Sequence, residues 1–184
     1  CDFFFFKIFE NMMTGMCPSQ IMGLLISAVT KIIIVYAVIL FSIIYVVKNK
    51  NLFNFDETIA ADIFTDIDFP WEVLPKIKDF ITGLGESLSP DDYDKKGDNV
   101  WIAKSAAIAP TATINGPCII GKGTEVRPGA FIRGNAIIGE KCVVGNSTEL
   151  KNVILFNNVQ VPHYNYVGDS ILGYKSHMLS LIHI

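Results

Sequence analysis

A histidine near the C-terminal end of the chain is the residue best suited to acid–base chemistry. His163 stands in the phrase Pro162-His-Tyr-Asn-Tyr-Val-Gly-Asp-Ser170, three residues before Tyr166. An imidazole, whose pKa is near neutrality, can take a proton from a reacting group at working pH. By residue type alone, however, a histidine in a loop is more often a surface or packing residue, and Tyr166 could equally pack between subunits.

Three cations upstream of this histidine could hold an anionic group. Arg127, Arg133 and Lys151 are the candidates. Arginine offers a bidentate fork to a phosphate and lysine offers a point charge. The ordinary alternative is that such residues are solvated charges at the corners of the fold. Glu149 is expected to pair with Lys151 or with a neighbouring corner rather than to act on a substrate.

A six-residue repeat precedes and positions these residues. Counting in sixes from Ile102 to Leu150, nine successive sixth positions are aliphatic, and a small residue follows each of the first eight by four positions. This period fits neither a helix nor a flat strand. It is typical of a parallel β-helix, in which stacked turns share one continuous core. Three repeats of six residues make a coil of 18, so Ile102, Ile120 and Ile138 are expected to stack.

The strict period breaks after Leu150, in the span that holds Lys151, His163 and Tyr166. The aliphatic series continues there with steps of five, six, six, five and six residues, through Leu155, Val161, Val167, Leu172 and Met178. Departures from an otherwise consistent pattern are expected at functional sites.

Composition excludes some classes of function. The chain has 184 residues, 51% hydrophobic and 18% charged, and most of the apolar excess lies in residues 1–50. The net charge is −3 and no cluster of Lys or Arg is present, so nucleic acid is not expected as a partner. Cys118 and Cys142 occupy small inward positions of the repeat and are expected to be buried thiols, which favours a reduced, cytoplasmic setting over a disulfide framework.

The N-terminal segment, residues 1–50, is a possible transmembrane helix. Residues 32–47 carry no charge, an apolar run from Ile21 precedes them, and Lys48 and Lys50 come directly after them. About 20 apolar residues span a bilayer, and the flanking lysines favour a cytoplasmic location for the C-terminal domain. The alternative is that this segment does not belong to the native protein.

Residues 51–98 are expected to form a helical cap and a solvated linker. Apolar residues recur at helical spacing from Trp71 to Leu84, after Pro70. We expect this cap to pack on the side of the prism or on its first coil. The β-helix is assigned to residues 99–178, and the tail at 179–184 breaks the repeat and is suspected to be non-native.

The sequence resembles a known family in three phrases: Val126-Arg-Pro-Gly-Ala, Val144-Gly-Asn-Ser-Thr-Glu-Leu-Lys151, and the His163 phrase. They are similar to the hexapeptide acyltransferase domain of bifunctional sugar-1-phosphate nucleotidylyltransferases, such as N-acetylglucosamine-1-phosphate uridyltransferase and its archaeal relatives. The resemblance covers roughly residues 100–178. It implies a left-handed parallel β-helix, a homotrimer, and transfer of an acetyl group from acetyl-CoA to the amine of glucosamine 1-phosphate, in UDP-N-acetylglucosamine biosynthesis.

The resemblance also implies roles for the candidate residues. His163 would be the general base, Tyr166 and Lys151 would contact the sugar phosphate, and an arginine would bind the phosphate. Arg127 has the matching local context, whereas counting back from His163 without gaps leads to Arg133, so both stay candidates.

Two departures from the family pattern limit the expected activity. No Gly-rich nucleotide loop precedes the repeat, so nucleotidyl transfer is not expected from this chain. The Gly-rich coils that would form much of the CoA site in the family do not follow Met178, so we expect a truncated domain.

Two other functions remain open. The first is a non-catalytic trimerisation or regulatory module of a sugar nucleotidyltransferase system. The second is a metal-dependent hydratase of the γ-carbonic-anhydrase type, with three histidines on zinc. His163, His177 and His183 are spaced by fourteen and six residues, which does not predict a metal site within one chain.

Overall fold

A computed structural model describes residues 18–178 of the chain, and it divides after Val46 into two compact units. The predicted tail at 179–184, which includes His183, lies outside the described residues. In the first unit the described part is one long helix, α2 (Pro18–Val46). Within it, Leu25–Val46 is long and apolar enough to cross a membrane, and none of that stretch is buried.

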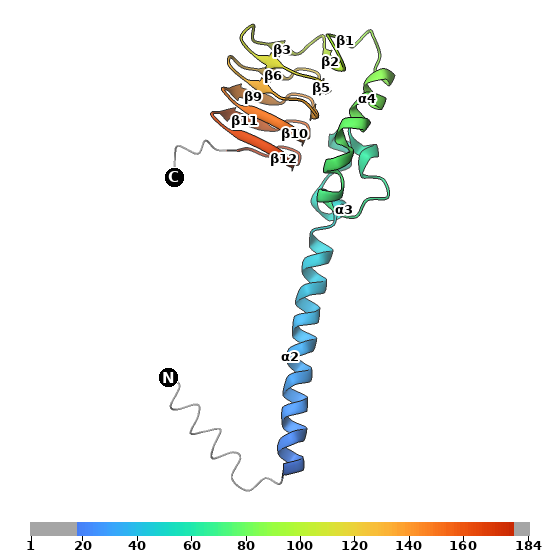
Figure 1. Cartoon of the computed structure of the whole chain (residues 1–184), viewed down its shortest axis with the longest axis vertical. Helices are drawn as coiled ribbons and strands as arrows, with labels where there is room; N and C mark the ends of the chain where they lie inside the picture. The colour runs from blue at the N-terminus through green and yellow to red at the C-terminus, as the bar shows by residue number, and fades with distance from the viewer. Residues whose placement is uncertain (1–17, 179–184) are drawn as a thin grey trace. The chain divides into compact units, whose positions relative to one another are not determined.

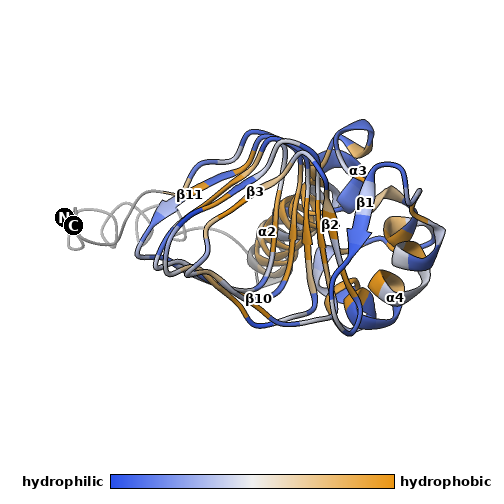
Figure 2. Cartoon of the chain, turned by 90° about the horizontal axis from the view of Figure 1, so that it is seen from above, coloured by the Kyte–Doolittle hydropathy of each residue, from blue (hydrophilic) through white to orange (hydrophobic). Residues whose placement is uncertain are grey.

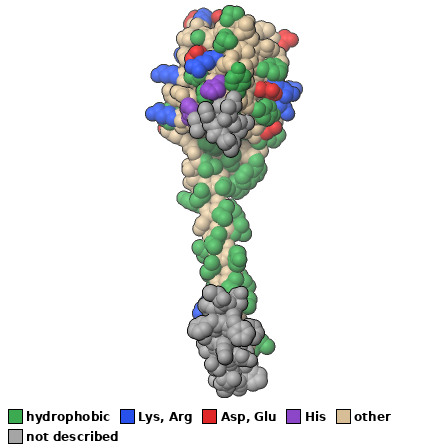
Figure 3. All heavy atoms as spheres, turned by 90° about the vertical axis from the view of Figure 1, so that its left-hand side faces the viewer, with side chains coloured by type: hydrophobic (Ala, Val, Ile, Leu, Met, Phe, Trp, Pro, Cys, Tyr) green, Lys and Arg blue, Asp and Glu red, His purple; other side chains and the backbone are tan. Residues whose placement is uncertain are grey.

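Hydrophobic side chains cover the visible face of α2 along much of its length (Figure 3). Two of its hydroxyl side chains are bonded within the helix. The hydroxyls of Thr30 and Ser42 donate to the carbonyls of Ile26 and Val38, each at 2.8 Å. Hydroxyls that are bonded within a helix tolerate hydrocarbon, so Thr30 and Ser42 are compatible with the predicted span, which stays a prediction.

The second unit contains a triangular prism of short parallel strands, stacked coil upon coil (Figure 1). Face 1 of the prism consists of β2 (Val100–Ala103), β5 (Cys118–Ile120), β8 (Ala136–Ile138) and the later halves of β10 (Glu149–Leu155) and β12 (Tyr166–Leu172). Face 2 consists of β3 (Ala107–Ile108), β6 (Glu125–Val126), β9 (Val143–Asn146) and β11 (Gln160–His163). Face 3 consists of β4 (Thr113–Ile114), β7 (Phe131–Ile132) and the first halves of β10 and β12.

The aliphatic positions of the repeat stack in register on all three faces. On face 1 the column is Ile102, Ile120, Ile138, Leu155 and Leu172. On face 2 it is Ile108, Val126, Val144 and Val161, and on face 3 it is Ile114, Ile132, Leu150 and Val167. The predicted fold class, a mainly β protein built on a left-handed parallel β-helix with N-terminal helical segments, is confirmed.

The expected break in the period lies at one corner of the prism. Between the paired positions Ile132 and Ala136 the corner has three residues, but in the next coil Lys151 and Asn152 alone join Leu150 to Val153. Asn152 turns this shorter corner with a φ of 54°. The following coil repeats the two-residue corner at Gly168 and Asp169, and the Asn152 side chain donates to Asp169 at 2.7 Å.

The small inward positions are filled as predicted. Cys118 and Cys142 are buried free thiols, and burial raises the pKa of Cys118 to about 12 and that of Cys142 to about 11. Thr124 is also fully buried, and its hydroxyl donates to the Gly139 carbonyl at 2.7 Å while accepting from the Cys142 amide at 3.0 Å. A buried polar group at this position is therefore tolerated because it is fully bonded.

Face 1 differs from the other two because it is apolar on both sides. Its outward residues Trp101, Ile119, Ile137 and Ile154 are buried. The helix α4 (Ile77–Ser87) packs against β5, β8 and β10, and lies along this face when the prism is seen end-on (Figure 2). The cap therefore packs on the side of the prism, one of the two predicted places, and it removes face 1 from solvent.

The cap is less regular than its apolar spacing predicted. Residues between Pro70 and Lys76 form two 3-10 helices, η3 (Pro70–Glu72) and η4 (Leu74–Lys76), before α4 begins. Pro75 explains this, because proline cannot continue an α-helix through its own missing N–H. The remaining elements are α3 (Asn49–Leu52), η1 (Phe55–Glu57) and η2 (Ala61–Phe64). They bring Phe53, Phe55 and Phe64 around the buried ring of Phe156.

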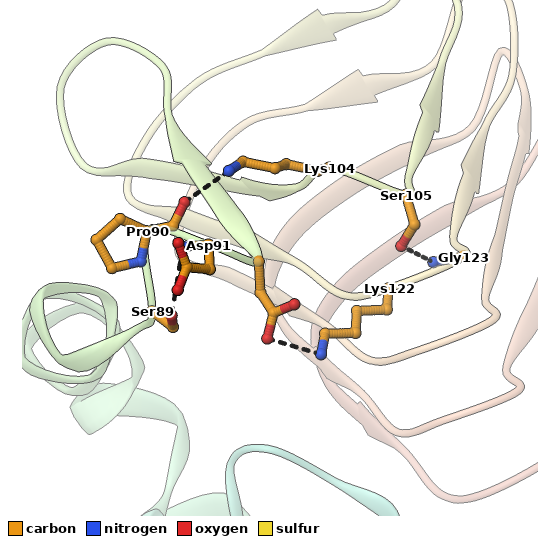
Figure 4. A network of polar contacts seen from close by, with 8 residues as sticks. Ser89, Pro90, Asp91, Lys104, Ser105, Lys122 and Gly123 are labelled. Atoms are coloured by element: carbon orange, nitrogen blue, oxygen red, sulfur yellow. Dashed lines mark hydrogen bonds and ion pairs between the residues drawn. The ribbon is translucent and has the colours of Figure 1, made fainter.

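Part of the predicted linker is ordered against the first coil. The strand β1 (Tyr93–Lys95) pairs antiparallel with β2 and covers its free edge. Figure 4 shows two lysines that hold this segment: Lys104 donates to the Pro90 carbonyl at 2.7 Å, and Lys122 donates to Asp92 at 2.9 Å. Residues 89–98 are therefore not simply a solvated linker.

Candidate active site

The candidate residues lie at two corners of the prism that border face 3. We call the corner between faces 2 and 3 the histidine corner, formed by residues 127–129, 146–147 and 163–165. We call the corner between faces 3 and 1 the lysine corner, formed by residues 133–135, 151–152 and 168–169.

His163 ends β11 at the histidine corner, in register with Asn146 of the coil before. Its side chain is exposed, and its ring lies edge-on to Tyr164 with the ring centroids 6.1 Å apart. The carbonyl of His163 accepts from the Asn165 side chain at 2.8 Å, and Asn165 is buried. A buried amide thus fixes the turn that presents the imidazole to solvent.

Asn165 was missed by sequence reasoning, although a signal for it existed. It follows Val161 by four residues and so occupies the small inward position of its repeat, where most coils have Ala, Cys or Thr. An asparagine at such a position needs a bonding partner. The polar exception in the pattern therefore pointed to the turn that carries His163.

Tyr166 begins β12 on face 3 and leans toward the lysine corner. In register, it lies beside Glu149 of β10, which lies beside Phe131 of β7. A Cβ built on Gly168 would collide with the Tyr166 phenol, so the ring extends over this glycine. Gly168 is itself in register with Lys151, which places the phenol at the lysine corner.

Arg133 joins this group through an ion pair. Its Nη1 lies 2.7 Å from Glu149 Oε1, and its amide donates to the Leu150 carbonyl at 2.8 Å. The hydrogen bond that Arg133 donates to Glu149 raises the pKa of Arg133, the Coulombic attraction of Glu149 adds to this, and Tyr166 makes a smaller contribution. Glu149 was expected to pair with Lys151 or with a neighbouring corner. The second alternative is confirmed, because Glu149 pairs with Arg133 of the coil before.

Arg127 lies apart from these residues. It belongs to the histidine corner, and its guanidinium donates to both carboxylate oxygens of Glu125 in β6, at 3.0 and 3.3 Å. Asn146, which is in register with His163, donates to the Pro128 carbonyl at 2.8 Å. The two candidate arginines therefore occupy different corners.

One chain thus brings Arg133, Lys151 and Tyr166 together with Glu149, and it holds His163 at the opposite edge of face 3. His163 and Gly168 are five residues apart along this face, which corresponds to a span on the order of 15 Å. That separation exceeds the reach of a hydrogen bond from the imidazole. Among residues 18–178, no group of three or more His, Cys, Asp or Glu side chains is placed to hold a metal ion.

Comparisons with known proteins agree with the resemblance seen in the sequence. A family model described as the GMPPB C-terminal domain matches residues 114–184. The protein named "Bifunctional protein GlmU" of Methanococcus aeolicus is 38% identical over 133 residues, covering 62% of this chain and 28% of that protein. Its namesake in Methanococcus maripaludis is 40% identical over 112 residues, covering 60% and 27%.

A third relative of the same name, from Methanocaldococcus jannaschii, is 35% identical over 116 residues, covering 60% of this chain and 28% of that protein. The chain therefore spans less than a third of the length of these relatives. The resemblance to the hexapeptide-repeat domain of these bifunctional proteins is confirmed.

Proposed function

We propose that the β-helix is a CoA-dependent N-acetyltransferase domain that acts on an amino-sugar phosphate such as glucosamine 1-phosphate, in nucleotide-sugar biosynthesis. The observation that carries this proposal is the meeting of Arg133, Lys151 and Tyr166 at one corner. Two cations and a phenol suit a sugar phosphate, because each can donate to its oxygens. The similarity to GlmU proteins supports the same class of reaction.

In the proposed reaction the sugar amine attacks the thioester carbonyl of acetyl-CoA. An N–C bond forms, the C–S bond breaks, and CoA leaves as the thiol. His163, whose ring is exposed at the end of β11, takes the proton that the amine loses, and this proton passes to the departing CoA sulfur. Arg133 and Lys151 hold the phosphate, so Arg133 shares or exchanges its contact with Glu149 when substrate binds. Much of the rate comes from orientation of the two substrates.

The complete site is proposed to form between copies of the chain in a homotrimer. Within one chain His163 lies across face 3 from the lysine corner, so a neighbouring copy has to bring the two together. Face 3 presents the partly exposed rings of Phe131 and Tyr166, which offer apolar contact area. Face 1 cannot serve, because α4 already covers it.

We place this domain on the cytoplasmic side of a membrane that Leu25–Val46 spans. The candidate span meets the length and hydropathy that a bilayer requires, and Lys48 and Lys50 come directly after it. In this proposal the acetyl donor is cytoplasmic. The nucleotide-sugar pathway that the similarity to GlmU proteins suggests is cytoplasmic as well.

Thiol release from acetyl-CoA tests the proposed function. The protein expressed from its complete reading frame, given acetyl-CoA and glucosamine 1-phosphate, should release one thiol per sugar acetylated. N-acetylglucosamine 1-phosphate, which has no free amine, is the matched control and should release none. If no amino-sugar phosphate is acetylated and acetyl-CoA does not bind, the reaction is wrong and a non-catalytic trimerisation module is favoured.

A further inference from the structure

The segment immediately C-terminal to α2 is bound tightly to the cap of the second unit. Lys48 is two residues beyond the last residue of the candidate span, so chain connectivity alone keeps it within about 8 Å of that residue. Asn49 is buried, its amide donates to the Asp68 carbonyl at 2.7 Å, and its side chain donates to the Ile67 carbonyl at 3.0 Å. The chain therefore enters the cap at residues 67–68.

An ion pair adds to this attachment. Lys48 Nζ lies 2.8 Å from Asp68 Oδ2, and the same ammonium is 6.0 Å from the centre of the Phe69 ring. Lys50, two residues later, is exposed. These contacts place residues 67–69 of the cap beside Lys48 and Asn49, at the start of the second unit.

Two aromatic rings project at this place. Phe69 and Trp71 are stacked, with ring centroids 4.7 Å apart and planes inclined by 7°, and Trp71 is 58% exposed. The Phe69 amide donates to the Glu72 carboxylate at 3.0 Å, which fixes the turn that carries the two rings. Trp71 therefore presents an exposed ring, stacked on Phe69, that another surface can contact.

Lipid is the surface that fits this chemistry and position. Tryptophan is enriched where membrane meets water, because its ring is amphipathic and its N–H can reach polar groups. Lys48 is neutralised by Asp68, and Asp66 and Glu72 are acidic neighbours in sequence, so a purely electrostatic attraction to anionic lipid is weak. The rings, rather than the lysines, have to supply the affinity.

We propose that Phe69 and Trp71, with Lys48 beside Phe69, form an exit surface that lies at headgroup level in the phospholipid bilayer that Leu25–Val46 spans. The occupant of this surface is the lipid interface. The inference rests on the proposed membrane span and is independent of the proposed acetyl transfer, because none of its residues belongs to the two corners of face 3.

Tryptophan emission from the whole chain in phosphatidylcholine vesicles tests this inference. Only Trp71 and Trp101 emit, and Trp101 is buried beneath α4, so the difference between the native chain and Trp71→Phe isolates Trp71. Spin-labelled lipid with the label near the headgroup should quench Trp71 more strongly than lipid with the label near the bilayer centre. The phenylalanine keeps the ring stack, so the variant is expected to fold.

A tryptophan moved to the β-helix provides the matched control. In the double variant Trp71→Phe, Phe131→Trp, the emission should be unaffected by either spin-labelled lipid. If the protein resists alkaline carbonate extraction but Trp71 is quenched by neither label, the exit surface is wrong while the span stands. Shielding of Trp71 from aqueous iodide without lipid quenching would identify a protein partner and overturn lipid as the occupant. Extraction by carbonate would overturn the span and the exit surface together.

Discussion

Arg133 and Arg127 have the same chemistry but different surroundings, and this separates their proposed roles. Arg133 shares a corner with Lys151 and Tyr166, whereas Arg127 is held by both oxygens of Glu125 at the other corner. Charge-assisted hydrogen bonds contribute about 1.5–3 kcal/mol, so Arg133→Ala should raise the KM for the sugar phosphate roughly 10- to 100-fold.

Arg127→Ala is the matched control and should change this KM by less than about threefold, since a solvated ion pair contributes little. Steady-state kinetics with the sugar phosphate varied measure both values. A large rise for Arg127→Ala with none for Arg133→Ala would reverse the assignment.

The buried thiols at the inward positions should be inert. The pKa of Cys118 is about 12 and that of Cys142 about 11, against an ordinary value of 9.0. Because the folded state favours the protonated thiols, their contribution to stability is present below about pH 9 and is lost as the pH rises toward 11–12. Iodoacetamide at pH 8 should leave both unmodified in the folded protein and label both in denaturant, as peptide mass spectrometry would show. Labelling of Cys118 in the folded protein would contradict its burial.

The sequence predicted the residue types at the site but not their grouping. Spacing alone left Arg127 and Arg133 equivalent, because each follows an inward aliphatic by one residue. Their distinction depends on which strand pairs with which, and on the two-residue corner at Lys151 and Asn152. The sequence shows that one repeat is shorter by one residue. It does not show which corner of the prism has one residue fewer.

At the scale of elements, the close packing of α4 on face 1 depends on one glycine, Gly85. A Cβ at Gly85 would lie 2.5 Å from the Trp101 ring, whereas a Cβ at Gly83 on the same helix would meet nothing within 4 Å. Gly85→Ala should therefore destabilise the second unit by about 1–3 kcal/mol through overpacking.

Gly83→Ala should instead stabilise it by about 0.5–1 kcal/mol, because alanine loses less conformational entropy in a helix. Chemical denaturation of the two variants under the same conditions measures the difference. Equal stability of the two variants would show that α4 does not pack on Trp101 as described.

The period of six predicted which residues form the inward columns of the prism. It did not predict that the outer side of face 1 is buried. The period identifies the inward position of each repeat, but not which face another element covers. In every third repeat a second large apolar residue precedes the inward one, as in Ile119-Ile120 and Ile137-Ile138, but Phe131-Ile132 and Val143-Val144 show the same pair on the other two faces. The helix of the cap was also predicted to be too long. The helical spacing of apolar residues continues from Trp71 through Pro75, but the α-helix α4 begins only after this proline.

At the scale of the whole molecule, the proposed site combines the two corners of face 3 from two copies of the chain. If His163 of one copy acts with Lys151 of another, then His163→Ala and Lys151→Ala should each be inactive alone. Mixed trimers formed by refolding the two together should regain up to about a quarter of native activity, because random assembly leaves that share of sites with both side chains. The acetyl-transfer rate of the mixture measures this. Mixed trimers without activity would place the whole site within one chain.

The imidazole at the end of β11 is the proposed general base for acetyl transfer. A positioned general base typically contributes 10²–10⁴-fold, so kcat of His163→Ala should fall by about that factor. His177→Ala is the control, because His177 is also exposed and lies on the strand edge beside Gln160, away from both corners. We expect native turnover for His177→Ala and a loss of at least about 100-fold for His163→Ala. Native turnover in a correctly folded His163→Ala protein would contradict it.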